Sequence, residues 1–188
     1  YPDSFYQQRF GTLAGNENSY FMQNLSVRKT LGAYFSNVGM VYYQNQKLGR
    51  AVFYLGLSTA INPQSIDAQN NLANIYSELK KPHKAIDHYN LALKADPNNS
   101  STLFNLGLAF MESGESSKAI NAFLQVVQIE TGFSPAHKML VNLYLQQKRF
   151  TSSLLHLKLL ARIQPDNLQN HLNIASSYGK MGQQALAL

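Results

Sequence analysis

The sequence has no cysteine among its 188 residues, which excludes a disulfide framework and a cysteine-based metal site. This absence fits oxidising and reducing compartments equally, so it leaves the localisation open. Charged residues are also scarce, at 14%, whereas hydrophobic residues reach 45% and supply enough material for a core, which argues against intrinsic disorder. The densest apolar stretch, residues 51–61, contains Ser58 and Thr59 and is shorter than the roughly 18 residues that cross a bilayer. We therefore predict no membrane span.

The net charge of +6 is concentrated in one part of the chain. Residues 134–167 hold five basic residues against Asp166, which gives +4, whereas residues 100–133 hold Lys118 against three glutamates, which gives −2. The five basic residues fall at different helical phases and form no run: Lys138, Lys148, Arg149, Lys158 and Arg162. A nucleic-acid partner is not expected, because its binding needs basic residues clustered on one face.

Several positions recur at a step of 34 residues from residue 32 to the end of the sequence, without an insertion or deletion. They comprise apolar–small pairs, an aromatic residue three positions later and a small residue further on: Val38-Gly39, Leu72-Ala73, Leu106-Gly107, Leu140-Val141 and Ile174-Ala175; Tyr42, Tyr76, Phe110, Tyr144 and Tyr178; Ala51, Ala85, Ala119, Ser153 and Ala187. Apolar residues recur every three or four positions within each period, which predicts two amphipathic helices. Turns such as residues 114–116 separate the helices, and stop signals such as residues 96–99 follow the second one.

A helix-turn-helix unit of 34 residues with this residue order resembles the tetratricopeptide repeat (TPR) family. The resemblance covers four full units, 32–65, 66–99, 100–133 and 134–167, and a partial fifth unit, 168–188. It implies an all-α fold over residues 31–188, a right-handed TPR superhelix (α-solenoid) of stacked antiparallel helix pairs. By the family pattern, the second helix of the fifth unit runs about eight residues beyond residue 188, which favours a longer natural chain.

Residues 1–30 do not follow the repeat pattern. They are rich in glycine and asparagine and precede a helix that we predict from about Tyr20 to Thr30. We interpret this segment as a cap on the first unit, and the tail of an upstream domain is the alternative. The start at Tyr1, with no initiator Met and no leader pattern, favours a processed or excised piece.

The sequence contains no catalytic or metal-binding constellation that we can recognise. The five histidines include no two at the spacing of three or four that metal binding on a helix favours: His83, His88, His137, His156 and His171. His137 and His171 stand at the helix-opening position of adjacent units, so we interpret both as packing residues. No nucleophile, base and orienting group can be assembled, and we predict no enzymatic activity and no cofactor.

Asparagines recur where the family resemblance places a binding surface. In TPR arrays the first helices line a concave groove, and the residue just before the apolar–small pair points into it. This position holds asparagine in four units, and Met139 interrupts the series: Asn37, Asn71, Asn105 and Asn173. Three more asparagines fall near the same face by helical spacing: Asn70, Asn74 and Asn142. An amide both donates and accepts, so such a series resembles the asparagine ladder with which some TPR proteins hold a peptide backbone. Asparagine is also common at this position throughout the family, which is the competing interpretation.

Apolar residues accompany the asparagines on the predicted inner face. Phe104, Leu108 and Met111 are expected to form a patch on the third unit, which Met40 and Tyr43 extend on the first; packing against neighbouring helices is the alternative. The clamp with which some TPR proteins grip acidic chaperone tails is not expected. Of its positions only Asn71 matches, and the basic members are missing: Ser36, Met40, Asn71, Ser101 and Asn105.

These patterns predict a protein-interaction module that binds a peptide or partner segment in its concave groove. Two alternatives remain open at this point. The chain is the non-catalytic arm of a larger enzyme, or it self-associates through the exposed ends of the array.

Overall fold

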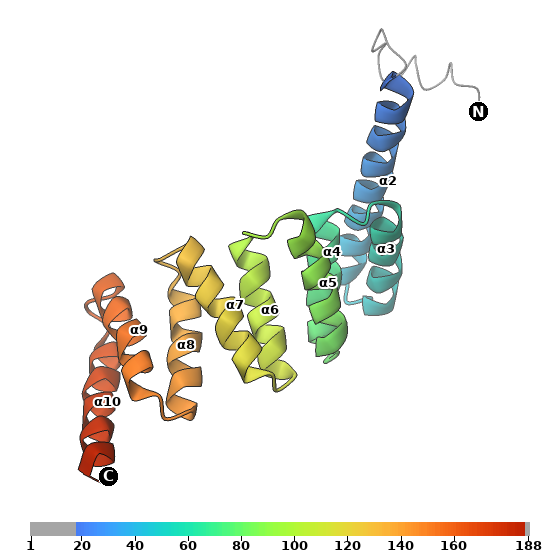
Figure 1. Ribbon diagram of the computed structural model, residues 1–188. Coiled ribbons are helices and arrows are strands. Elements are labelled where there is room, and N and C mark those ends of the chain that lie inside the picture. The colour runs from blue at the N-terminus through green and yellow to red at the C-terminus, as the bar shows by residue number, and fades with distance from the viewer. Residues whose placement is uncertain (1–17, 187–188) are drawn as a thin grey trace. The chain divides into compact units, whose positions relative to one another are not determined.

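The computed structural model describes residues 18–186 of the chain, with side chains from residue 26 to residue 182. All regular elements in these residues are helices (Figure 1). They are α2 (Asn18–Gln44), α3 (Leu48–Ile61), α4 (Ile66–Glu78), α5 (Pro82–Ala95), α6 (Ser100–Glu112), α7 (Ser116–Ile129), α8 (Ser134–Gln146), α9 (Phe150–Ile163) and α10 (Leu168–Leu186). The predicted all-α repeat of helix pairs is therefore confirmed.

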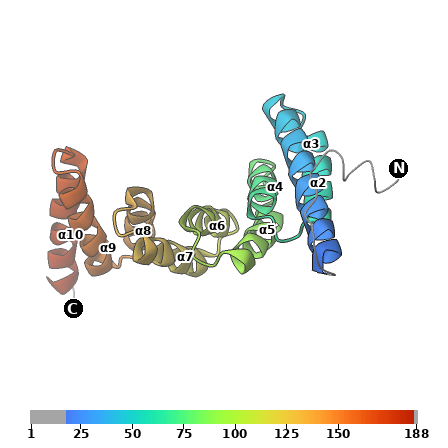
Figure 2. The ribbon, with the colours of Figure 1, turned by 90° about the horizontal axis from the view of Figure 1, so that it is seen from above.

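The helices belong to two compact units, which divide between Ala68 and Gln69. In the first unit, α2 packs against α3. In the second unit, each helix from α5 to α10 packs against the next one along the chain. Figure 2 shows α6 and α8 on one side of the second unit and α5, α7 and α9 on the other. The first helices of the third and fourth repeats thus lie on the same side of this unit.

The turn between the two helices of a pair has one conformation that returns at every period. Its residue with positive φ comes at a step of 34: Gln46 (59°), Lys80 (56°), Gly114 (80°) and Lys148 (56°). The next residue in each turn donates its backbone N–H to the carbonyl five residues earlier, as from Lys81 to Tyr76 at 2.8 Å. These two features define the Schellman motif, a helix ending in which a left-handed residue lets the following N–H groups bond to the last carbonyls. Three of the four residues are not glycine, so each carries a conformational cost.

The first and second helices of a pair approach closely at the small residue of the repeat. A Cβ built on Gly39 would lie 2.7 Å from Leu55 Cγ, and one on Gly107 would lie 2.5 Å from Phe123 Cε1. Both Leu55 and Phe123 are fully buried. In the second and fourth units the small position holds a larger residue, Ala73 or Val141, and belongs to the same hydrophobic cluster as the buried residue of the second helix, Tyr89 or Leu157.

A cation covers the repeated aromatic residue in successive pairs. Arg50 lies 5.5 Å from the centre of the Tyr42 ring, Lys84 lies 5.4 Å from Tyr76, and Lys118 lies 5.4 Å from Phe110, all at the same step of 34. Ser152 takes this position in the fourth pair, where Arg149 covers the aromatic residue instead, 4.7 Å from the Tyr144 ring. The sequence analysis did not identify this contact, although its positions follow the period.

The helix predicted from about Tyr20 to Thr30 lies within α2, which continues without a break into the first helix of the first repeat. The change of pattern near residue 31 is therefore not a boundary between elements. The interpretation of residues 1–30 as a cap or as the tail of an upstream domain stays a prediction, and residues 1–17 lie outside the described part of the chain.

Candidate functional site

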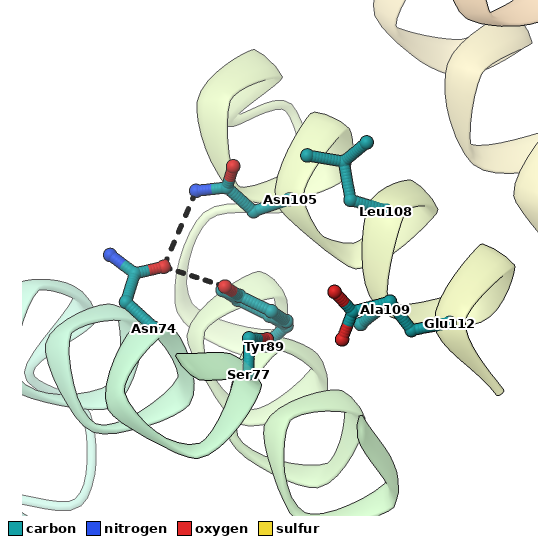
Figure 3. A pocket seen from close by; sticks show the side chains of 7 residues that line it. All are labelled: Asn74, Ser77, Tyr89, Asn105, Leu108, Ala109 and Glu112. Atoms are coloured by element: carbon teal, nitrogen blue, oxygen red, sulfur yellow. Dashed lines mark hydrogen bonds between the residues drawn. The ribbon is translucent and has the colours of Figure 1, made fainter. Parts of the chain in front are cut away.

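A small open hollow of about 190 Å³ lies among α4, α5 and α6, within the second compact unit (Figure 3). Its lining comes from all three helices: Asn74, Ser77, Tyr89, Asn105, Leu108, Ala109 and Glu112. Most of these residues stand on the first helices of two neighbouring repeats, α4 and α6. The hollow combines hydrogen-bonding groups with the apolar side chain of Leu108.

Three polar side chains converge at one edge of this hollow. The hydroxyl of Tyr89 donates to Asn74 Oδ1 at 2.6 Å, and the amide of Asn105 donates to the same oxygen at 3.5 Å (Figure 3). Tyr89 is 2% exposed, and burial raises the pKa of its hydroxyl, so it remains a donor at neutral pH. These contacts orient the Asn74 carbonyl toward Tyr89 and leave its amide nitrogen pointing away from both residues (Figure 3).

The hollow has an acidic edge. Glu112 lines it and pairs with Lys80 at 3.4 Å, where the two side chains are 38% and 80% exposed. An ion pair this exposed contributes little to stability, since water and salt screen it. The carboxylate of Glu112 is therefore accessible to a ligand and disfavours a negatively charged one.

The structure brings three of the ten predicted site residues together. Asn74, Asn105 and Leu108 meet at the hollow. Asn70 is instead engaged between neighbouring repeats, because its amide donates to Thr102 Oγ1 at 2.8 Å. Thr102 is 1% exposed, and Asn99 caps α6 by accepting from its backbone N–H at 3.0 Å. The amide of Asn70 thus supports the start of α6 rather than an open surface.

The other predicted asparagines lie apart from this group. Asn37 belongs to the first compact unit, Asn71 is half-buried on α4, and Asn142 is exposed on α8. Asn173 on α10 accepts a hydrogen bond from Gln169 at 2.9 Å. An unbroken row of amides is not among the contacts of the described residues, and the ladder stays a prediction.

The apolar patch predicted on the third unit is largely used for packing. Phe104 lies with its ring centre 5.5 Å from that of Phe123 and 5.3 Å from that of Phe133. Met111 packs against the same hydrophobic cluster, and both side chains are half-buried. The alternative that the sequence left open, packing against neighbouring helices, therefore describes these two residues better, and Leu108 is the member of the patch that lines the hollow.

The two histidines predicted as packing residues differ in their exposure to solvent. His137 is 2% exposed, in agreement with the prediction, and its ring lies against that of His156, a contact that the sequence analysis missed. His171 is exposed, so its prediction is wrong. Helix α10 packs against α9 through another face, and the His171 ring donates to the Pro165 carbonyl at 2.8 Å.

The described residues provide neither a metal-binding group nor a membrane-spanning helix. No group of three or more histidine or acidic side chains there is arranged to hold a metal ion. None of the helices in this part of the chain has the length and hydropathy needed to traverse a bilayer.

Comparison with known families agrees with the repeat seen in the structure. Two profiles of the tetratricopeptide repeat match the chain, at residues 66–99 and 88–121, and the first match coincides with the second unit that the sequence predicts. The chain is a tetratricopeptide repeat protein. The second match begins in a second helix and so covers the same TPR period in another frame.

Solved TPR structures share the fold at low sequence identity. The crystal structure of MamA protein is 16% identical, with a TM-score of 0.74 over 84% of this chain and 86% of that one. A second structure is described as YrrB, a TPR protein with an unusual peptide-binding site. It is 15% identical, with a TM-score of 0.68 over 79% of this chain and 76% of that one. These similarities support an all-α helical repeat.

Curated relatives are considerably longer than this chain. The human protein O-mannosyl-transferase TMTC3 is 25% identical over 173 residues, which cover 89% of this chain and 19% of that protein. The TPR and J domain-containing co-chaperone DNJ1 of Fusarium oxysporum is 28% identical over 99 residues, which cover 50% of this chain and 19% of that protein. The chain thus spans about a fifth of the length of these two relatives.

Proposed function

We propose that this TPR protein-interaction module binds an extended peptide segment of a partner protein at the hollow among α4, α5 and α6. The observation that carries the proposal is the convergence of Asn74, Asn105 and Tyr89 beside Leu108. Amide groups match the donor and acceptor of a peptide backbone, and the leucine supplies a contact for one apolar side chain.

The affinity expected from this arrangement is modest. Each hydrogen bond contributes a net of about 0.5–1.5 kcal/mol, so two amides give only a few kcal/mol before the cost of ordering the peptide. An extended peptide rises about 3.3 Å per residue, so a hollow of this size accommodates only a short stretch of it. Further contacts along the first helices, where Asn71 and Asn142 stand, then have to supply the remaining affinity.

The charge of the site indicates which peptides fit. Glu112 at the rim repels a carboxylate, and the basic members of the chaperone-tail clamp are missing from the sequence. We therefore expect neutral or basic peptide segments rather than acidic C-terminal tails. The structural similarity to the YrrB protein, described as having a peptide-binding site, favours peptide binding without defining the peptide.

A direct test compares peptide binding by the chain with binding by the Asn74→Ala/Asn105→Ala variant. A display library of short neutral and basic peptides supplies the ligand, and fluorescence anisotropy measures its dissociation constant. We expect the double variant to bind at least about tenfold more weakly, which corresponds to about 1.4 kcal/mol. Tyr89→Phe is expected to weaken binding less, because it removes the hydroxyl that orients Asn74 and keeps the ring.

Asn121→Ala is the matched control. Asn121 is exposed on α7, in the layer of second helices, so its replacement should leave binding unchanged. Circular dichroism checks that all variants keep their helix content. Equal binding by the unmodified chain and the double variant, with helix content intact, would rule out this hollow as the peptide site.

A second candidate function follows from the relation to the O-mannosyl-transferase. That similarity covers most of this chain but only 19% of the relative, so the segment similar to this chain is a small part of that transferase. The corresponding proposal is that this chain is the non-catalytic TPR arm of a larger enzyme. The full reading frame tests it directly, because a flanking catalytic domain either is or is not encoded.

A further inference from the structure

His137 and His156 form a buried imidazole pair inside the fourth repeat. His137 lies near the start of α8 and His156 lies in the middle of α9, and their side chains are 2% and 5% exposed. Their two Nδ1 atoms are 3.0 Å apart, and His137 Nε2 lies 3.0 Å from the carbonyl oxygen of Thr131. The pair therefore connects the two helices of the repeat and the turn that precedes them.

The hydrogen bonds determine where the protons reside. A carbonyl oxygen only accepts, so His137 Nε2 carries the hydrogen that it donates to Thr131. Neutral His137 then has a lone pair on Nδ1, and His156 must donate its Nδ1 hydrogen to it. In this arrangement both rings are neutral, with His156 as the hydrogen-bond donor and His137 as the acceptor.

An additional proton has no favourable position on this pair. On His137 Nδ1 it would place two N–H groups opposite each other unless His156 moved its hydrogen to Nε2, and either form holds a buried imidazolium. On His156 Nε2 it would create a buried cation, which is costly without a compensating charge. The His156 ring also stacks on Tyr144, 5.8 Å between centres, and that ring already carries the guanidinium of Arg149.

The elements around the pair provide no negative charge to compensate. Glu130 and Asp166, the carboxylates nearest in the sequence, bond to neither ring, and the residues of α10 that are buried, Asn170 and Ser177, are uncharged. Lys158, on α9 itself, lies over the Tyr178 ring of α10. Burial, followed by the electrostatic effect of the neighbouring His137, lowers the pKa of His156 to about 4.

The second repeat has a different pair at the equivalent positions. His88 Nδ1 lies 2.8 Å from Gln69 Oε1, and the His88 ring stacks on Tyr76. A glutamine carbonyl accepts from an imidazole N–H whether the ring is neutral or charged, so a proton on the other nitrogen keeps this hydrogen bond. The third repeat has Leu103 and Ala122 at these positions, and neither residue titrates.

We propose that the His137–His156 pair makes the fourth repeat open on mild acidification, while the third repeat, which has no titratable residue at these positions, stays closed. Protonation places a cation in this buried pair, so opening of the contact between α8 and α9, which lets water solvate the cation, becomes more favourable. Because each repeat contacts only its neighbours, the opening stays local. The unit that opens includes α8, which presents Asn142, and α9, on which α10 packs.

Hydrogen exchange followed by mass spectrometry tests this proposal in the whole chain, at pH 7.5 and pH 5.0 after correction for intrinsic exchange rates. A group whose pKa falls from 6.5 to about 4 on folding increases the opening of its repeat by roughly ten- to thirtyfold between these pH values. We expect that loss of protection in peptides from α8 and α9, and a change of less than about threefold in α6 and α7. An equal loss in both regions would overturn the proposal.

The variant His137→Leu/His156→Ala installs the residue pair that the third repeat already uses. It should remove the extra acid-induced opening, and persistence of that opening in the variant would also overturn the proposal. If this variant does not fold, His137→Gln copies the Gln–His pair of the second repeat and should reduce the pH effect several-fold. His83→Gln controls for the loss of a histidine outside the pair. His83 is exposed on α5, so this change should leave the acid-induced opening of the fourth repeat as it is.

Discussion

Gly107 lies where two helices of the third repeat meet, and its replacement by alanine gives a sharp test of this packing. A Cβ at this position would lie 2.5, 2.8 and 2.9 Å from Cε1, Cζ and Cδ1 of Phe123. Phe123 is fully buried, and Phe104 packs beside it, so the ring has little room to move. Overpacking of this kind costs about 1–3 kcal/mol. Alanine favours a helix over glycine by up to about 1 kcal/mol, so we expect Gly107→Ala to lower the free energy of unfolding by about 1–2 kcal/mol.

The fourth repeat suggests how this loss is rescued. There a larger residue, Val141, packs with Leu157, which occupies the position of Phe123. Combining Gly107→Ala with Phe123→Leu should therefore cost less than the sum of the two single changes, with a coupling of about 1 kcal/mol in urea unfolding followed by circular dichroism. Gly179→Ala on α10 is the control, because nothing lies within 4 Å of its Cβ, and it should stabilise. If Gly107→Ala stabilises as Gly179→Ala does, the close approach of the two helices is not as described.

Three further changes have outcomes that follow from the structure. Ser153→Ala should raise the free energy of unfolding by about 1 kcal/mol in urea titrations, because its buried hydroxyl has no partner and the four other repeats have alanine there. Lys148→Gly should raise it by roughly 0.5–1 kcal/mol, since φ is 56° at this turn residue. His156 has a pKa lowered to about 4, so its contribution is complete above the unfolded value of 6.5 and is lost as the pH falls toward 4. The loss should reach about 2–3 kcal/mol in pH-dependent thermal unfolding, and His137→Leu/His156→Ala should reduce it.

The helix pairs could be predicted because the same residue pattern occurs several times in the sequence. Small residues such as Gly39 and Gly107 stand where the backbone of a second helix approaches, and a step of 34 places them in register. Proline and asparagine after the second helix then mark the ends. The turn conformation at Gln46 and Lys80 could not be predicted, because residues other than glycine seldom adopt a positive φ.

The candidate site was only partly predictable. The TPR resemblance indicated Asn105 and the apolar patch with Leu108 on the inner face, and helical spacing added Asn74; these three residues line the hollow. The sequence did not identify Tyr89, since its position in the repeat indicates a core residue and its hydroxyl reaches the hollow only through the bond to Asn74. It also did not predict that Thr102 would engage the amide of Asn70, because that contact joins neighbouring repeats.

The histidine pair shows why spacing along one helix was an insufficient guide. His137 and His156 are 19 residues apart and meet only because the turn brings the start of α8 beside the middle of α9. The sequence did contain a signal, since Gln69 and His88 have the same separation two periods earlier. Pairs of polar residues that recur at a fixed separation across a repeat indicate a contact between its two helices.

The two positions that His137 and His156 occupy in the fourth repeat hold residues of different chemistry in the other repeats. The period of 34 residues is the same in each case. Phe35 stacks on Tyr54 in the first repeat, with ring centres 6.3 Å apart, where the fourth has His137 and His156. All of these pairs fill similar space between the two helices, so packing tolerates the exchange, but they differ in how they respond to a proton. Because the stability of a repeat array is approximately the sum of its units and their interfaces, such an exchange changes one unit without altering the shape of the others. A sequence of this kind can therefore adjust the stability of single repeats while the surface made by α4 and α6 stays the same.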